Sequence, residues 1–282
     1  MIKCTDIHKR FNGKEVLSGI NIEIPDGNIF GLLGPSGAGK TTLIKIITGQ
    51  LEFEKGSVTI LDKNVDELTG SDRRNIGIMM DRFGLYERFS CIDNLKVFAD
   101  IYGVSYSKIK ETLELVGLGD SMKKSASNLS KGMWVRLNLA RVFMISPKVI
   151  FLDEPTSGLD PQTSKQIRKI ILDKKNSGCT VFLTTHNMEE AYELCDTVAL
   201  LNEGVIAECG NPQEICRKHN HQKRINLHLS SGEDIELGQD EKAAERVFEL
   251  LKTGRVETIH SSEPTLETVF LELTGRNLQE GA

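Results

Sequence analysis

Short runs of consecutive apolar residues recur along the chain, and glycine, proline or polar residues bound each run. Runs of about four to six mostly apolar residues are typical of strands that are buried on both faces, as in a parallel sheet. Residues 28–33, 148–152 and 180–185 fit this pattern. Residues 197–201 and 204–207 flank the pair Asn202-Glu203 and predict a hairpin. The chain is therefore expected to have a core of buried strands.

Two other regions have different patterns. Residues 1–30 predict short strands around a turn at Asn12-Gly13, and positions 16–24 mostly alternate between apolar and polar. Between residues 85 and 135 the apolar positions are spaced as in helices, and the last of these helices is expected to start after Ser130. We interpret this region as a helical insertion in the strand-rich core.

The composition becomes polar after Pro212, and residues 213–224 are expected to form a connector. The elements predicted beyond it are a hairpin (225–229 and 235–237), a helix (241–252), a strand (255–259) and a helix (266–273). This division predicts two domains. The first covers residues 1–216 and contains the helical insertion at about 85–135, and the second is a small C-terminal domain covering 217–282.

Composition and charge limit the classes of function. The hydrophobic fraction of 39% and the charged fraction of 27% are typical of a globular protein. The net charge of −5 argues against a general nucleic-acid binder, which usually carries a basic face. The N-terminus has no apolar signal-peptide core, and no run approaches the ~18–20 apolar residues of a membrane span. A role at a membrane would therefore require another chain that spans it.

The cysteine pattern predicts free thiols. The six cysteines stand at positions 4, 91, 179, 195, 209 and 216, and no two have Cys-x-x-Cys spacing. Cys216, His219 and His221 lie close together in the sequence, which brings a metal site to mind. The polar connector around them argues against that interpretation.

A glycine-rich loop follows the apolar run at 28–33. The pattern Gly34-x-x-x-x-Gly39-Lys40-Thr41 is that of a P-loop, in which backbone N–H groups and a helix N-terminus hold phosphate oxygens. In this pattern Lys40 reaches the β- and γ-phosphates, and the Thr41 hydroxyl ligates Mg²⁺. The residues expected to bind the nucleotide here are Gly34, Pro35, Ser36, Gly37, Ala38, Gly39, Lys40, Thr41 and Thr42.

Two carboxylates end the apolar run at 148–152. A strand buried on both faces would deliver Asp153 and Glu154 to the edge of the sheet that carries the phosphate loop. We expect Asp153 to hold Mg²⁺ and Glu154 to orient or deprotonate the attacking water. A plain pair of acids at a turn is the alternative, and the P-loop upstream argues against it.

Three further motifs identify a family. The segment Leu129-Ser130-Lys131-Gly132-Met133 resembles the signature motif of ABC ATPases, which is usually Leu-Ser-Gly-Gly-Gln. Ser157-Gly158-Leu159-Asp160 resembles the D-loop of that family, and His186 resembles its switch histidine. The resemblance covers about residues 1–212. It implies an α/β fold: a P-loop NTPase (RecA-like) core with an antiparallel β subdomain, an inserted α-helical subdomain and a small α+β C-terminal appendage.

The resemblance also implies a mechanism. Two cassettes, here expected to be identical chains, would close over two ATP molecules. Each site would use Lys40, Thr41, Asp153, Glu154 and His186 of one chain, and Ser130, Lys131, Gly132 and Met133 of the other. Asp160 would lie in the D-loop, and Phe11 and Val16 would contact the adenine. The implied ligands are ATP and Mg²⁺, and the implied partner is a membrane-spanning permease that holds the chain at the cytoplasmic face of the membrane.

The sequence departs from the family pattern at two places. Asp81 stands after the run 76–80, where the family usually has glutamine, and it remains an uncertain Mg²⁺ ligand. In the signature motif, Lys131 replaces the usual glycine and Met133 the usual glutamine. These departures motivate a second hypothesis, a nucleotide-binding regulator that turns over poorly.

The C-terminal segment 263–275 is similar to the tail of bacterial drug, antibiotic and lantibiotic exporter cassettes. This similarity favours an exporter over importers with longer regulatory domains. Retention of Lys40, Glu154 and His186 favours an active ATPase over the regulator. A third possibility is a non-transport ABC ATPase, which usually carries two cassettes or a long coiled coil. The chain has neither, so this possibility is the least favoured.

Overall fold

The computed structural model describes residues 1–80, 84–221, 223–261 and 263–275. A six-stranded sheet crosses the main body in the order β10-β9-β3-β8-β7-β6. Its strands are β3 (Ile29–Leu33), β6 (Ile76–Met79), β7 (Val149–Asp153), β8 (Thr180–Thr185), β9 (Thr197–Asn202) and β10 (Val205–Gly210). All neighbours pair in parallel except β9 and β10, which form the predicted hairpin. Its turn is at Glu203-Gly204, one residue later than predicted, because these two residues take positive φ.

The buried strands of this sheet lie between two apolar layers. On one side, Phe182 packs with Phe30 and Phe151, and the ring centroids are 5.3 and 5.4 Å apart. Leu152 and Leu183 belong to the core on the opposite side. The continuous apolar runs follow from this arrangement, because alternate residues of a strand point to opposite faces.

A four-stranded antiparallel sheet covers the first of these layers in the order β2-β1-β4-β5. Its strands are β1 (Ile2–Phe11), β2 (Lys14–Ile24), β4 (Lys55–Ile60) and β5 (Lys63–Asn64). The turn at Asn12-Gly13 is confirmed, and both residues have positive φ. The prediction of short strands was wrong, since β1 and β2 are 10 and 11 residues long. Strand length is predicted from the alternation of apolar and polar residues. Register shifts within the β1–β2 pair interrupt this alternation, so each long strand looks like shorter ones.

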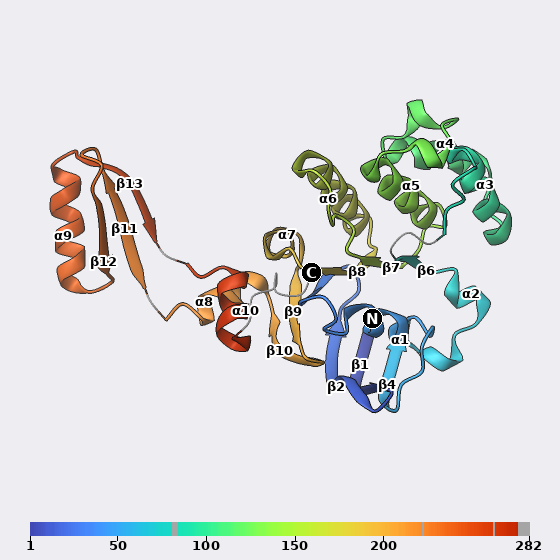
Figure 1. The fold of residues 1–282 in the computed structure, drawn as a ribbon, viewed down its shortest axis with the longest axis horizontal. Helices are drawn as coiled ribbons and strands as arrows, with labels where there is room; N and C mark the ends of the chain where they lie inside the picture. The colour runs from blue at the N-terminus through green and yellow to red at the C-terminus, as the bar shows by residue number, and fades with distance from the viewer. Residues whose placement is uncertain (81–83, 222, 262, 276–282) are drawn as a thin grey trace.

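Helices surround the two sheets, and those of the helical region stand to one side of the body (Figure 1). The helices are α1 (Lys40–Ile47), α2 (Gly70–Arg73), α3 (Cys91–Tyr102), α4 (Ser107–Leu115), α5 (Lys131–Phe143), α6 (Pro161–Asn176), α7 (Met188–Leu194), α8 (Pro212–Lys218), α9 (Glu241–Lys252) and α10 (Leu266–Thr274). The start of the last insertion helix after Ser130 is confirmed, and the helix continues past 135 to Phe143. No helix in the described ranges is long and apolar enough to cross a membrane.

The connector predicted at 213–224 was partly wrong, because it begins with helix α8. The Asn211 side chain accepts hydrogen bonds from the backbone N–H groups of Gln213 and Glu214, and Pro212 occupies the first turn. Ile215 and Cys216 bury an apolar face that the polar composition conceals.

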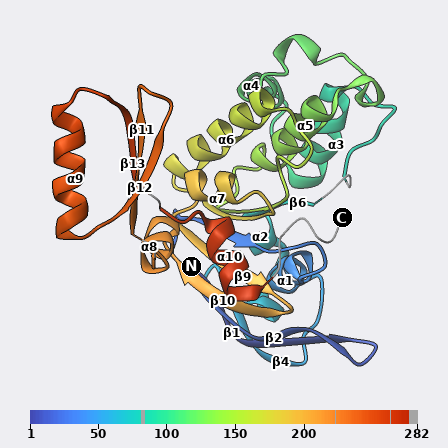
Figure 2. The same cartoon turned by 60° about the vertical axis from the view of Figure 1, so that its left-hand side comes forward.

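The C-terminal residues form a separate three-stranded sheet, ordered β12-β11-β13, with α9 against it (Figures 1 and 2). Its strands are β11 (Arg224–Leu229), β12 (Asp234–Gly238) and β13 (Val256–Ser261). After β13 the chain returns, and α10 buries Leu266, Val269 and Phe270 in the core of the main body. The division at residue 217 stays a prediction. The packing of α10 nevertheless shows that the last helix contributes to the core of the first 216 residues.

Candidate active site

The phosphate loop joins β3 to α1 and requires glycine at two positions. A Cβ atom at Gly34 would lie 2.3 Å from the carbonyl oxygen of Leu201 on β9. Gly39 has φ +110°, and a Cβ there would lie 2.7 Å from Leu17 and 3.1 Å from the carbonyl oxygen of Val16. The loop is therefore held between β9 and the start of β2, with its backbone bent as a phosphate cradle needs.

The side chain of Lys40 is buried within this loop. Its amine donates hydrogen bonds to the carbonyl oxygens of Gly34, at 2.6 Å, and Pro35, at 3.1 Å. It also lies 3.4 Å from Oε1 of Glu154. These contacts hold the positive charge of Lys40 at the mouth of the loop.

A second set of hydrogen bonds links the loop to the end of β7. The Thr41 hydroxyl donates to Oδ2 of Asp153 at 2.9 Å, and the Thr184 hydroxyl donates to Oδ1. Thr184 was not predicted as a site residue. It lies on the neighbouring strand β8 in register with Asp153. Because each oxygen of the Asp153 carboxylate accepts from a different hydroxyl, the orientation of the carboxylate is fixed, with Oδ2 beside the Thr41 hydroxyl.

Glu154 lies between Lys40 and His186. Its Oε2 is 3.1 Å from Nδ1 of His186, and both side chains are partly exposed. The Glu154 backbone has φ +47°, a left-handed conformation that costs a non-glycine residue of the order of 1 kcal/mol. Its N–H donates to both oxygens of Thr184, the carbonyl and the hydroxyl, each at 3.1 Å. The strained backbone is thus pinned to β8.

A buried carboxylate holds the segments that follow β7 and β8, where Glu154 and His186 lie. Glu190 of α7 is 1% exposed, and it accepts hydrogen bonds from Thr156 at 2.7 Å and from Thr185 at 3.0 Å. Thr156 follows Glu154, and Thr185 precedes His186. Glu190 was not predicted, because its sequence gives no sign that two distant hydroxyls converge on it. It acts as a positioning residue for Glu154 and His186.

Replacement of Glu190 by alanine is expected to lower the free energy of unfolding by about 2–3 kcal/mol, because it leaves two buried hydroxyls without an acceptor. The neighbouring Glu189 is exposed and serves as the control. Urea unfolding of Glu190→Ala, Glu189→Ala and the natural chain measures the difference. Equal midpoints in all three proteins would show that the hydroxyls find other partners.

The signature residues begin helix α5. Ser130 is its N-cap, and its hydroxyl accepts from the N–H of Met133 at 3.3 Å. A Cβ at Gly132 would lie 2.6 Å from the Thr163 methyl group of α6, so this glycine permits close helix packing. The Lys131 amine lies against Gly158 of the D-loop in the same chain. The role of these residues opposite a partner's nucleotide stays a prediction.

The other predicted residues fall around these elements. Asp160 is the N-cap of α6, and hydrogen bonds from Thr163 hold its pKa below the usual value. Phe11 is 44% exposed at the end of β1, with the Lys9 amine 5.2 Å from its ring centre. Val16 adjoins Gly39 of the loop, and its contact with adenine stays a prediction. Asp81 lies outside the described residues, so its metal role stays a prediction.

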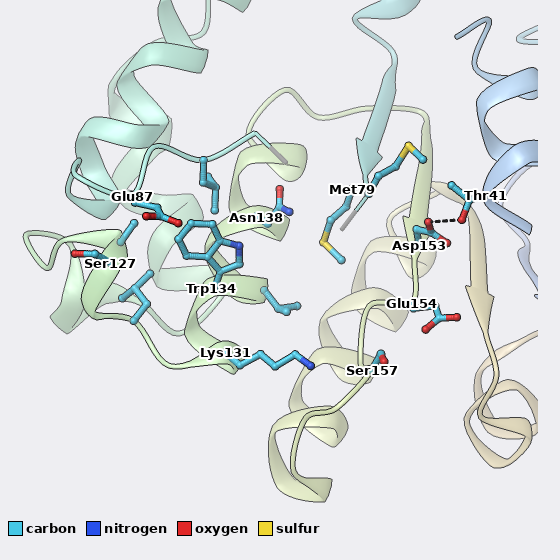
Figure 3. Close-up of a pocket in the computed structure, with 15 residues that line it drawn as sticks. Thr41, Met79, Glu87, Ser127, Lys131, Trp134, Asn138, Asp153, Glu154 and Ser157 are labelled. Atoms are coloured by element: carbon cyan, nitrogen blue, oxygen red, sulfur yellow. Dashed lines mark hydrogen bonds between the residues drawn. The ribbon is translucent and has the colours of Figure 1, made fainter. Parts of the chain in front are cut away.

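A cavity of about 690 Å³ extends from the catalytic acids to the helical region (Figure 3). Thr41, Asp153 and Glu154 lie at one end and Trp134 of α5 at the other. The Trp134 indole N–H is buried and has no hydrogen-bond partner in the part of the chain that the structure describes. Sequence analysis missed Trp134, since a single tryptophan on a helix usually belongs to the core.

The cysteines are consistent with free thiols. Burial raises the pKa of the Cys4 and Cys179 thiols to about 12, and Cys209 alone among the six is exposed. Because the other five thiols are buried, a reagent reaches only Cys209 readily, and we expect one fast-reacting thiol in the native protein. Titration with a chromogenic disulfide reagent measures this number, and Cys209→Ser is expected to remove the fast phase.

A phosphate loop on a parallel sheet, with two acids on the next strand but one, defines a P-loop nucleotide hydrolase. Comparison with known proteins narrows this class. The ABC transporter family model matches residues 17–157, half of the chain. A fluoroquinolones export ATP-binding protein of Mycobacterium tuberculosis is 39% identical over 92% of this chain and 88% of its own length. A methionine import ATP-binding protein of Clostridioides difficile is 37% identical over 76% of this chain and 70% of its own length.

The fold gives the same result. A solved ATP-binding subunit of an ABC transporter superposes with a TM-score of 0.69 and 26% identity, covering 77% of this chain and 92% of that one. The chain belongs to the ABC transporter family. It is an ATP-binding ATPase subunit of that family.

Proposed function

We propose that two copies of this chain bind two molecules of MgATP at their interface and hydrolyse them to drive export through a separate membrane-spanning subunit. The observation that carries the proposal is the convergence of Lys40, Glu154 and His186 at one end of the sheet. The Glu154 carboxylate lies 3.4 Å from the Lys40 amine and 3.1 Å from Nδ1 of His186. Such a cluster supplies a phosphate-binding cation, a carboxylate base and a second polar group beside one reacting phosphate.

The roles follow from the contacts. Lys40 neutralises charge that develops on the transferred phosphoryl group, since its amine is fixed in the loop. Glu154 orients the attacking water and accepts its proton, and its contact with His186 at 3.1 Å keeps the carboxylate directed at the site. His186 contacts the γ-phosphate and helps to hold the water. Ser130 and Gly132 of the second copy would close the site from the opposite side.

Thr41 and Asp153 fit a Mg²⁺ ion. Mg²⁺ prefers hard oxygen ligands, and the hydroxyl and carboxylate oxygens of these residues lie 2.9 Å apart beside the loop. When bound, the ion would neutralise charge on the β- and γ-phosphates. The carboxylate of Asp153 is oriented for this role by Thr184.

Export is favoured by the similarity of the whole chain. The relative from M. tuberculosis, an export protein by name, matches over 92% of this chain, whereas the import protein matches over only 76%. We infer that the membrane partner docks on the cavity beside Trp134 and the nearby residues Leu85 and Glu87.

Two measurements test this function. Purified chain with Mg²⁺ is expected to release phosphate from ATP. A cross-linker placed at Glu87→Cys, with Cys209→Ser to remove the exposed native thiol, is expected to capture a multi-span membrane protein. Capture of no membrane protein by a variant that unfolds in urea as the natural chain does would argue against transport. Loss of ATP turnover together with intact ATP binding would favour the regulator.

The substitution Asp81→Gln separates the two hypotheses further. If Asp81 slows turnover, restoring the residue usual in the family is expected to raise the steady-state rate several-fold. If Asp81 serves an active ATPase directly, the same change is expected to lower the rate. Phosphate release by both proteins at saturating ATP measures the direction.

A further inference from the structure

Two histidines and a glutamate meet where the last helix returns to the main body. His219 and His221 follow α8, and Glu272 lies on α10. Nε2 of His221 is 3.3 Å from Oε1 of Glu272, and Nδ1 of His219 is 3.9 Å from Oε2 of the same carboxylate. One ligand atom from each residue lies within 4.8 Å of the others. The three groups can therefore face a single point.

One nitrogen of the buried histidine lacks a hydrogen bond. The His219 side chain is 10% exposed, and its buried Nδ1 atom has no hydrogen bond from any of the described residues. Leaving a buried polar atom unpaired costs about 1–3 kcal/mol, so such an atom indicates a ligand that completes it. This nitrogen is directed at Glu272, toward the same point that His221 faces.

The contact of the other ring nitrogen of His219, Nε2, determines which nitrogen carries the proton of the neutral ring. Its Nε2 is 3.3 Å from Oε2 of Glu208 on β10, and the Lys218 amine lies 2.7 Å from the same oxygen. The Glu208 carboxylate, paired with the Lys218 amine, accepts a hydrogen bond from the Nε2–H group. The neutral ring then carries its lone pair on Nδ1, the nitrogen without a partner.

We propose that His219, His221 and Glu272 bind a divalent transition-metal ion of the zinc class. Two imidazole nitrogens and one carboxylate oxygen are a known ligand set of Zn²⁺, and imidazole disfavours Mg²⁺ and Ca²⁺. A carboxylate that accepts from the far nitrogen of a ligating histidine is the arrangement that usually orients such ligands. Glu208 has this role here. Cys216 does not take part, because its thiol is buried in the core.

The site joins two segments that are distant in sequence. His219 and His221 precede the three-stranded sheet, and Glu272 follows it. A bound ion would therefore fasten α10 to α8 and close the loop that contains β11, β12, α9 and β13. Fixing both ends of a long loop stabilises the folded chain, since only the folded chain brings the ligands together.

The test uses the complete chain, Zn²⁺ and Co²⁺, with excess Mg²⁺ present to occupy the nucleotide site. Competition with a chromogenic chelator gives the Zn²⁺ affinity, and the visible spectrum of bound Co²⁺ reports its coordination. The variants are His221→Ala and Glu272→Gln, whose side chains are partly exposed and whose folding is checked by unfolding without metal. His228→Ala is the matched control, because His228 also pairs with a carboxylate, that of Asp234, on the exposed face of β11.

Outer-shell partners contribute about 10- to 100-fold to metal affinity. We therefore expect Glu208→Gln to weaken Zn²⁺ binding by about that factor, and each ligand variant to weaken it by more than about 100-fold. His228→Ala is expected to bind as the natural chain does. Zn²⁺ is also expected to raise the unfolding midpoint of the natural chain and not that of His221→Ala.

Two results would overturn the proposal. If His221→Ala and Glu272→Gln bind Zn²⁺ as tightly as the natural chain, the ion binds elsewhere. If the natural chain itself binds no Zn²⁺ in the chelator competition, the three residues form only histidine–carboxylate pairs. Neither result bears on ATP hydrolysis, since the cluster uses no residue of the nucleotide site.

Discussion

Glu154→Gln is expected to lower ATP turnover by about 10²- to 10⁴-fold while leaving ATP binding intact, because a positioned general base contributes about this factor. Glutamine has nearly the same shape and keeps an oxygen near Lys40 and His186, at present 3.4 and 3.1 Å from the carboxylate. It cannot accept the proton of the attacking water. Phosphate release under steady-state conditions measures turnover, and equilibrium binding of ATP measures occupancy.

Glu189→Gln is the matched control for this substitution. Glu189 carries the same charge near the site, on the first turn of α7, and its side chain is exposed. We expect its turnover to equal that of the natural chain. We also expect Glu154→Gln to form a dimer on gel filtration in ATP, since bound nucleotide would no longer be hydrolysed. Turnover at the natural rate in Glu154→Gln would remove Glu154 from the role of base.

Lys40→Ala is expected to have a second large effect, on both nucleotide binding and turnover. The amine is the buried cation of the phosphate loop, and removal of one such electrostatic contact lowers the rate by about 10²- to 10³-fold. Equilibrium ATP binding and phosphate release measure the two functional losses.

Lys45→Ala is the control for Lys40→Ala. Lys45 lies on the same helix α1, and its side chain is exposed. It is expected to bind and hydrolyse ATP normally. If Lys40→Ala bound ATP with unchanged affinity, the phosphates would have to be held by backbone N–H groups alone, and the role assigned to the amine would be wrong.

Sequence alone predicted those parts of the fold and site that short segments specify. The apolar runs at 28–33, 148–152 and 180–185 became adjacent parallel strands, because such strands are apolar on both faces. Asp153 and Glu154 were predicted to lie beside the phosphate loop, and the Thr41–Asp153 and Lys40–Glu154 distances agree. Each of these features depends on a spacing of a few residues.

The features that sequence did not predict depend on contacts between distant segments. Thr184 and Glu190 carry no motif, and they acquire their roles only when β8 and α7 pack beside β7. Helix α8 was concealed because a short helix in polar sequence is stabilised by its cap and by two buried side chains. The pairing of His219 with Glu272 requires the path of the whole C-terminal region, which no local pattern contains.

The return of α10 to the main body has a consequence for the modularity of the chain. The three-stranded sheet and α9 leave and rejoin the body at neighbouring points, since His221 before the sheet lies beside Glu272 after it. An inserted unit whose two ends lie close together can be exchanged or deleted without displacing the segments on either side of it. This unit, rather than the whole C-terminus, is thus the natural segment to transplant between cassettes, while α10 stays with the ATPase.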